Sequence, residues 1–377
     1  MQYMFTAEQE EFRSVLRRFL EEKSPTSAIR KLMETEAGWD RAGWQEINQQ
    51  MGLTAVAIPE EYGGQGFGFV ELGIVAEETG RALLCAPFFA SAVLAAGAIL
   101  NAGTEEEKRR LLPPIASGEC IATLAFTEPN GGWETDAITT TATAASGGTY
   151  RLNGTKSFVL DGHTADLIVV LARRAGTTGD DGLSFFVLPG DAPGLERRAL
   201  AVLDPTRKLA RLEFNNAEAR LLGAEGAGAE PFARTLRGAV VTLASEMAGG
   251  ADKLRESALD YANLRVQFGR SIASFQSMKH KQADMLIEVE LAKSAAYQAA
   301  AAAADDDPDL PFIASLAKAA TAEAYMQTAI HTIQIHGGIG FTWDNDTHLW
   351  FKRAKSSEVF LGDPTWHREK MMQAWNV

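Results

Sequence analysis

The stretch Asn263-Leu-Arg-Val-Gln-Phe-Gly-Arg-Ser-Ile-Ala-Ser-Phe-Gln276 places two side chains, Arg265 and Phe268, at one end of a long helical region. A glycine-rich segment, Gln334-Ile-His-Gly-Gly-Ile-Gly-Phe341, follows later in the chain. An arginine can pair with a phosphate, a phenylalanine can cover a flat ring, and glycines let backbone approach a ligand closely. Each segment alone also fits an ordinary helix turn with a glycine cap. Together, in this order, they favour the ligand-binding interpretation.

The composition indicates a globular protein of two or three domains. The chain has 377 residues, of which 46% are apolar and 23% charged, so it can bury a sizeable core. Its net charge of −13, without a basic stripe, argues against a nucleic-acid partner. Cys85 and Cys120 stand in contexts without metal-ligand spacing, and they favour a reducing, cytoplasmic setting.

The N-terminal segment resembles an amphipathic helix, and no signal peptide is recognised in it. Phe12, Leu16 and Phe19 fall at helical spacing, and Thr6 with Gln9 predicts a capping box. No apolar run is long enough for a membrane span.

The order of elements predicts an α+β fold with three domains, at residues 1–120, 121–227 and 228–377. The first range is mainly helical, with a helix from Glu105 expected to stop at Pro113-Pro114. The middle range has short apolar runs and frequent turns, typical of a small β-domain, and Asn153-Gly154 predicts a hairpin turn. The last range predicts long antiparallel helices in a four-helix bundle.

Six segments resemble the acyl-CoA dehydrogenase family over nearly the whole chain. They are Pro59-Glu-Glu-Tyr-Gly-Gly64, Phe126-Thr-Glu-Pro129, Asn153-Gly-Thr-Lys156, Leu264–Gln276, Gln334–Phe341, and Arg353-Ala-Lys355 leading to Gly362. The resemblance implies a helical N-terminal domain, a middle β-barrel and a C-terminal four-helix bundle. It also implies a tetramer with FAD bound where subunits meet, an acyl-CoA substrate, and an electron-transfer flavoprotein as acceptor.

The resemblance assigns ten residues to FAD. Those matching flavin-ring contacts are Phe126, Thr127 and Phe158, where an aromatic ring can stack on the flavin. Arg265 matches the arginine that reaches the pyrophosphate, and the remaining matches are Phe268, Phe275, Gln276, Gln334, Gly337 and Gly338. For Phe268 and Phe275, simple core packing is the alternative. Leu160 departs from the family, which often has Thr or Ser there to bond the flavin N5 region.

The family's catalytic base is absent from both positions where it usually occurs. A Glu normally stands immediately before a Gly after the Ala-Lys pair, and this chain has Leu361 there. A second branch of the family carries the Glu on the first helix of the bundle, where this chain has Ala239. In that branch an Arg often follows the Glu, and this chain has Val240 there, so the contact of that Arg with CoA is not expected.

Nearby carboxylates offer weak substitutes for the base. Glu246 is the best of them, two helical turns past Ala239, although an acidic residue in a bundle is more often paired or solvated than catalytic. Glu358 and Asp363 flank Leu361. His280, His331 and His336 lack metal-ligand spacing and are expected to be packing partners or flavin-edge contacts.

Three hypotheses follow from this combination. The chain is one subunit of an α₂β₂ acyl-CoA dehydrogenase whose paralogous partner carries the Glu, as in some bacterial steroid-degrading relatives that act on bulky acyl-CoA thioesters. Alternatively, it is a homo-oligomeric dehydrogenase with a relocated base, or a non-catalytic subunit that holds flavin or CoA.

Overall fold

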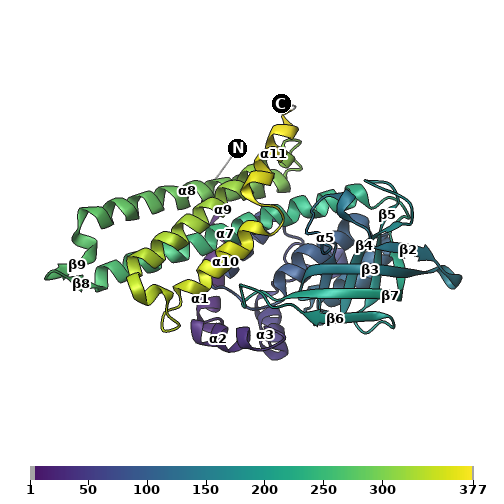
Figure 1. Cartoon of the computed structure of the whole chain (residues 1–377), viewed down its shortest axis with the longest axis horizontal. Helices are drawn as coiled ribbons and strands as arrows, with labels where there is room; N and C mark the ends of the chain where they lie inside the picture. The colour runs from purple at the N-terminus through teal and green to yellow at the C-terminus, as the bar shows by residue number, and fades with distance from the viewer. Residues whose placement is uncertain (1–4, 376–377) are drawn as a thin grey trace. The chain divides into compact units, whose positions relative to one another are not determined.

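The computed structural model describes residues 5–375, and these divide into two compact units. The first unit comprises residues 5–30, 69–84 and 240–375, and the second comprises residues 31–68 and 85–239. Helices therefore occur at both ends of the chain, and a sheet occupies its middle (Figure 1). The domain boundaries expected from the sequence stay a prediction.

The first unit is helical. Its α9 (Leu310–His336) packs against three other helices, α8 (Gln276–Ala304), α10 (Thr347–Val359) and α11 (Pro364–Ala374). From the N-terminal region come α1 (Ala7–Lys23) and α4 (Phe69–Arg81), which pack together. The expected capping box is confirmed, since the Gln9 N–H donates to the Thr6 hydroxyl and the Gln9 side chain accepts from the Thr6 N–H.

Two helices run from one unit into the other along the chain. Helix α2 (Thr26–Glu34) begins in the first unit and continues into the second, and α7 (Ala229–Leu264) begins in the second and continues into the first. Within the described residues, no helix is long and apolar enough to cross a membrane.

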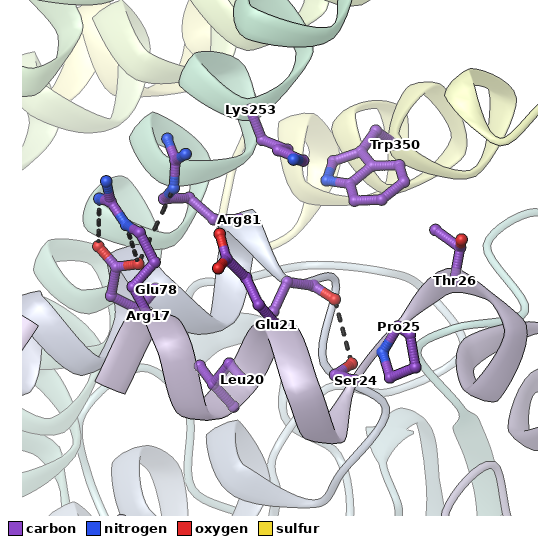
Figure 2. A pocket seen from close by; sticks show the side chains of 11 residues that line it. Arg17, Leu20, Glu21, Ser24, Pro25, Thr26, Glu78, Arg81, Lys253 and Trp350 are labelled. Atoms are coloured by element: carbon purple, nitrogen blue, oxygen red, sulfur yellow. Dashed lines mark hydrogen bonds and ion pairs between the residues drawn. The ribbon is translucent and has the colours of Figure 1, made fainter. Parts of the chain in front are cut away.

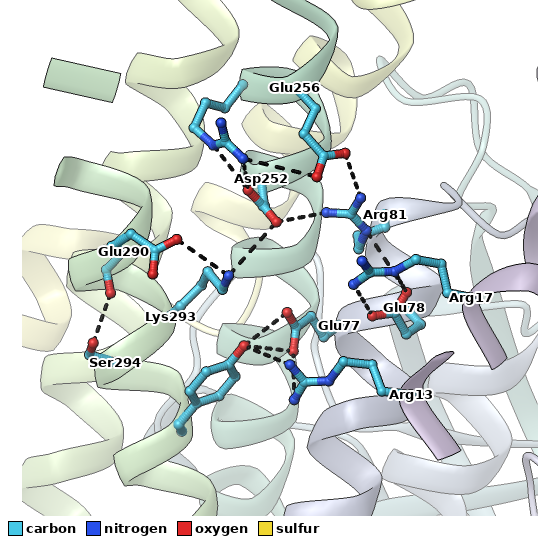
Figure 3. A network of polar contacts seen from close by, with 12 residues as sticks. Arg13, Arg17, Glu77, Glu78, Arg81, Asp252, Glu256, Glu290, Lys293 and Ser294 are labelled. Carbon is cyan, nitrogen blue, oxygen red and sulfur yellow. Dashed lines mark hydrogen bonds and ion pairs between the residues drawn. The ribbon is translucent and has the colours of Figure 1, made fainter. Parts of the chain in front are cut away.

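A network of buried charges connects the helices of the first unit (Figure 3). Glu78 is 1% exposed and receives a two-pronged contact from Arg17 at 2.9 and 2.7 Å. Arg81 reaches Asp252 of α7 at 2.7 Å and Glu256 at 2.6 Å. Every one of these buried charges faces an opposite charge, as burial in a medium of low dielectric constant requires.

The second unit is built on one sheet of seven strands. Its strands are β1 (Ala122–Ala125), β2 (Thr141–Ala144), β3 (Thr149–Leu160), β4 (Leu167–Arg174), β5 (Leu183–Pro189), β6 (Leu195–Ala199) and β7 (Leu209–Leu222). Five of them follow one another in the order β4, β2, β3, β7, β5, and β5 pairs back with β4. The sheet thus closes into a ring, as a barrel requires, while β1 and β6 pair outside it with β4 and β7.

Helices of the second unit precede the sheet in the chain. They are α3 (Arg41–Met51), a helical run from Phe89 to Ala102 that includes α5 (Ala96–Ala102), and α6 (Glu105–Ala116). The expected stop of α6 at Pro113-Pro114 is wrong, because the helix continues through both prolines to Ala116. The carbonyls that lose partners belong to the exposed residues Arg109 and Arg110, where water can replace the missing N–H groups.

The hairpin expected at Asn153-Gly154 is also wrong. Strand β3 runs unbroken from Thr149 to Leu160, and the irregularity lies opposite, where Asn216 of β7 adopts φ +53 at a register shift. Gly154 has φ +146, and a Cβ there would lie 2.6 Å from the Thr140 hydroxyl oxygen. The glycine is therefore required by a close approach inside the sheet rather than by a turn.

Gly154→Ala should lower the free energy of unfolding by about 2 kcal/mol or more, because the new methyl group meets Thr140 and the backbone φ is strained. The matched control is Gly147→Ala, where φ is +73 but an added Cβ meets no atom within 4 Å. Thermal unfolding of the two variants checks this. Equal losses would show that the close approach to Thr140 contributes nothing.

Candidate active site

The sheet unit holds the first group of predicted flavin contacts. Phe126 and Thr127 directly follow β1 and are 4% and 3% exposed. The ring of Phe126 packs against Phe232 at a centroid distance of 5.5 Å. Phe158, in contrast, is 43% exposed, and its φ is +61. It lies where the pairing of β3 with β7 shifts register, and this bulge turns its ring outward.

A buried lysine fixes the backbone that carries these residues. Lys156 is fully buried, and its Nζ donates to the carbonyl of Phe126 at 3.0 Å and to Glu128 Oε1 at 2.9 Å. The next N–H along β3, that of Ser157, donates to the carbonyl of Thr127 at 2.9 Å. The segment 126–128 is thus held on three consecutive residues.

Glu128 is the counter-charge of this lysine. Burial by itself would raise the pKa of Glu128, but the Lys156 ammonium, the Thr139 hydroxyl and the Thr140 N–H lower it to about 2. The carboxylate is therefore ionised at neutral pH, whereas burial lowers the pKa of Lys156 to about 8, so the ion pair is complete only between these two values.

The helical unit holds the second group, at the turn between α7 and α8. A short hairpin of β8 (Val266–Gln267) and β9 (Arg270–Ser271) presents Phe268 at its tip, with φ +54 and 91% exposure. The Phe275 ring meets Phe268 edge-on at 6.1 Å. Core packing therefore does not explain Phe268. Arg265 and Gln276 are exposed beside the same hairpin.

The end of α9 carries the glycine-rich segment. His336, the last residue of the helix, stacks on Tyr261 of α7 with ring centroids 4.2 Å apart, which fits the first of the two roles expected for it; a flavin-edge contact stays a prediction. Gln334 is exposed and accepts a hydrogen bond from Lys281 at 2.8 Å. Gly337 and Gly338 are exposed, and an added Cβ at either would meet open space. Their backbone is accessible to a ligand.

Leu361, at the usual position of the base, occupies a strained turn after α10. Its side chain is 3% exposed and its φ is +60, a conformation that costs a residue with a branched side chain about 1–2 kcal/mol. Gly362 follows with φ +101, and a Cβ there would lie 2.5 Å from the Trp366 ring. Within residues 5–375 no hydrogen bond is made to the Leu361 N–H.

Two buried side chains hold this turn in place. Lys318 of α9 is fully buried, and its Nζ donates to the carbonyls of Glu358 at 3.1 Å and Gly362 at 3.0 Å. His367 Nε2 lies 2.9 Å from the Leu361 carbonyl, so Nε2 is the ring nitrogen that donates. Burial lowers the pKa of His367 to about 4 and that of Lys318 to about 7. The histidine is therefore neutral.

The other carboxylates near these positions already have partners. Glu246 is 5% exposed and forms an ion pair with Arg353 at 3.4 Å, the arrangement expected for a structural rather than a catalytic residue. Asp363 caps α11 by accepting from the Trp366 N–H, and Glu358 pairs with Lys355. Ala239 is a buried residue of α7. In the described part of the chain, no group of His, Cys, Asp and Glu has the arrangement of a metal site.

The chain matches three domain families along its length. They are the N-terminal, middle and C-terminal domains of acyl-CoA dehydrogenase, over residues 6–119, 123–217 and 226–375. An acyl-CoA dehydrogenase of Bacillus subtilis is 33% identical over 82% of this chain and 83% of its own length. Acyl-CoA dehydrogenase IpdE2 of Mycobacterium tuberculosis is 31% identical over 90% of this chain and 88% of its own.

Solved structures agree with these matches. Butyryl-CoA dehydrogenase from Megasphaera elsdenii has a TM-score of 0.92 at 27% identity, with full coverage of both chains. A variant of the steroid acyl-CoA dehydrogenase Tcur3481-Tcur3483 has a TM-score of 0.86 at 29% identity, covering 98% of each chain. The chain belongs to the acyl-CoA dehydrogenase family of oxidoreductases, and FAD is its cofactor.

Four supporting residues, Lys156, Glu128, Lys318 and His367, are not predicted by the sequence. Lys156 and Glu128 lay inside motifs that were recognised without any role being assigned to them. Lys318 is the one cation in the apolar run Ile313-Ala-Ser-Leu-Ala-Lys-Ala-Ala320, and that contrast was an available signal. His367 offered no comparable signal, since its neighbours in the sequence are polar.

Glu128→Gln should lower the free energy of unfolding by roughly 3–5 kcal/mol, since Lys156 would be left buried without its counter-charge. The pKa of Glu128 falls from its ordinary value of 4.5 to about 2 in the folded protein. The contribution of Glu128 is thus complete above pH 4.5 and is lost as the pH falls towards 2. Acid unfolding of the wild type should show this loss. Glu128→Gln should not, and the exposed control Glu119→Gln should behave as the wild type.

The family resemblance implies that the Leu361 turn contacts the thioester. Lys318→Met should therefore weaken binding of an acyl-CoA about tenfold without abolishing folding, because the turn loses two hydrogen bonds. Titration of the flavin spectrum with acyl-CoA measures the affinity, and circular dichroism checks the fold. The control is Lys279→Met, an exposed lysine on α8. Unchanged affinity in a folded Lys318→Met protein would show that the turn needs no support from the lysine.

Proposed function

We propose that the chain takes part in α,β-dehydrogenation of an acyl-CoA thioester, as one subunit of a complex whose partner supplies the catalytic base. The observation that carries this proposal is the Leu361 turn, which keeps its strained conformation and, among the described residues, an N–H without a partner, although it lacks a carboxylate. In the reaction, a proton leaves Cα and a hydride leaves Cβ. FAD supplies the hydride acceptor at its N5 atom.

The residues of the helical unit fit the phosphate and adenosine side of FAD. Arg265 offers a planar pair of donors to the pyrophosphate, and its exposure supports this role. Phe268 is too exposed to serve the core, which supports a contact with the adenosine, together with Phe275 and Gln276. The open backbone at Gly337 and Gly338, beside Gln334, supports close approach of the pyrophosphate.

The residues of the sheet unit fit the flavin ring. Lys156 holds the carbonyl of Phe126 and the Ser157 N–H holds that of Thr127, and such support is what a contact to a flat ring requires. Phe158 presents an aromatic face from its bulge, which supports offset stacking on the ring. Leu160 cannot supply the hydroxyl that many relatives have. The proposal includes the barrel and the four-helix bundle that the resemblance implies.

The Leu361 N–H has a defined task in this scheme. It donates to the thioester carbonyl, and this hydrogen bond strengthens as negative charge develops on that oxygen when the Cα proton leaves. The chain lacks the proton acceptor, and absence of such a general base lowers the rate of the chemical step by about 10²–10⁴. Glu246 is a poor substitute, because it is buried and already forms an ion pair with Arg353.

The nature of partner and substrate is proposed from relatives. The name of the solved steroid acyl-CoA dehydrogenase joins two proteins, Tcur3481 and Tcur3483, and this suggests a heteromeric enzyme for bulky thioesters. By the same analogy, this chain forms an α₂β₂ tetramer with a Glu-bearing paralogue and delivers electrons to an electron-transfer flavoprotein.

Leu361→Glu provides the direct test. The purified chain with bound FAD should not be reduced by acyl-CoA, whereas the Leu361→Glu variant should regain reduction, because a carboxylate then stands beside Cα. Leu361→Gln is the matched control and should stay inactive. Loss of visible flavin absorbance after mixing with acyl-CoA reports the reaction, and the stoichiometry of FAD is measured beforehand.

Reduction of the wild-type chain alone would overturn the heteromeric proposal. In that case Glu246→Gln would decide whether Glu246 is a relocated base. Absence of FAD from the protein, alone and with its co-purified partner, would overturn the flavin assignment itself.

A further inference from the structure

A pocket of about 280 Å³ lies in the helical unit (Figure 2). It is formed by the C-terminal ends of α1 and α4, the start of α2, and one side chain each from α7 and α10, namely Lys253 and Trp350. None of the residues proposed to contact FAD or the thioester lines it. Its walls combine the apolar side chains of Leu20 and Pro25 with several polar groups, so it resembles a site for a small, partly polar molecule.

The Trp350 side chain shows that the pocket is built for an acceptor. Trp350 is 6% exposed, and its indole Nε1 has no hydrogen-bond partner in the described part of the chain. In Figure 2 the nitrogen-bearing edge of the indole is turned towards the Lys253 side chain. Buried donors are nearly always satisfied in folded proteins, so a group from outside is expected to accept this one.

Lys253 adds a positive charge at the same place. It forms no ion pair or hydrogen bond with any described residue, although it lies on a helix rich in paired charges. The indole N–H and the lysine ammonium are both hydrogen-bond donors without an acceptor atom, so they cannot bond to each other. An acceptor placed between Trp350 and Lys253 would satisfy both.

The start of α2 contributes a third donor group. Pro25 precedes the helix and has no side-chain acceptor, so the N–H groups of Thr26 and Ser27 have no partner within the described residues. Such an uncapped helix start carries a partial positive charge and attracts anions. Trp350, Lys253 and this helix start therefore all favour a negatively charged ligand.

The acidic residues of the pocket do not already fill this role. Glu78 is fully engaged by Arg17 and Arg81. Glu21 is exposed and forms no ion pair within the described residues. We propose that the pocket binds a small oxyanion, a carboxylate or a phosphate group, between the Trp350 indole and the Lys253 ammonium, in a pocket that the first turn of α2 makes more positive. Water can satisfy the indole N–H alone, but an anion also pairs with Lys253, because charge-assisted hydrogen bonds are about twice as strong.

The indole N–H of Trp350 reports directly on the ligand. The FAD-loaded full chain is labelled with ¹⁵N-tryptophan, and Trp350→Phe identifies the signal by its disappearance. Inorganic phosphate and acetate are then titrated separately. The Trp350 signal should move downfield and saturate with at least one of them, and the tighter ligand distinguishes a phosphate from a carboxylate site.

Two further variants separate a built site from general ionic effects. Lys253→Met should weaken binding about tenfold, since one charge-assisted contact is lost, while Glu21→Gln should strengthen it by removing a like charge. Lys279→Met, which does not line the pocket, should leave the affinity unchanged. The proposal is overturned if neither anion gives a saturable shift of the Trp350 signal, or if Lys253→Met binds as the wild type does.

Discussion

A buried lysine amine that donates to backbone carbonyls supports two segments of the site, residues 126–128 and the turn at Leu361. Lys156 holds the carbonyl of Phe126 in the sheet unit, and Lys318 holds those of Glu358 and Gly362 in the helical unit. Each amine is fully removed from water, which is costly unless its N–H groups find acceptors. A lysine in this role reaches two or three atoms at once, and so it fixes a segment that has no regular hydrogen-bond ladder of its own.

Three of the site residues have a strained backbone. Phe158, Phe268 and Leu361 adopt φ values of +61, +54 and +60, although bulky residues rarely do so. Strain of this kind persists only where the surroundings over-determine the conformation, and it gathers at sites of function. At Leu361 the surroundings are Lys318 and His367. The turn therefore keeps its strained conformation even though Leu361 carries no carboxylate.

Local signals predicted the helices well and the sheet less well. The capping box at Thr6 and the long periodic helices depend on neighbours in the sequence, and they appear where expected. The Asn153-Gly154 pair gave a turn signal of equal strength but lies inside β3, because its conformation is set by Thr140 and by a bulge in β7, both distant in the chain. The motif residues were recognisable from the sequence. The contacts of Lys156, Lys318 and Trp350, which are made across elements, were not.

Burial of Lys318 has a chemical consequence for a protein that handles thioesters. With its pKa lowered to about 7, a large share of this amine is uncharged at neutral pH and would be a good nucleophile. Thioesters acylate such amines. Complete burial keeps the substrate's carbonyl carbon away from the nitrogen, so the packing that supports the Leu361 turn also protects the protein from acylation by its own substrate. Acylation of Lys318 would therefore require α9 and the Leu361 turn to separate first.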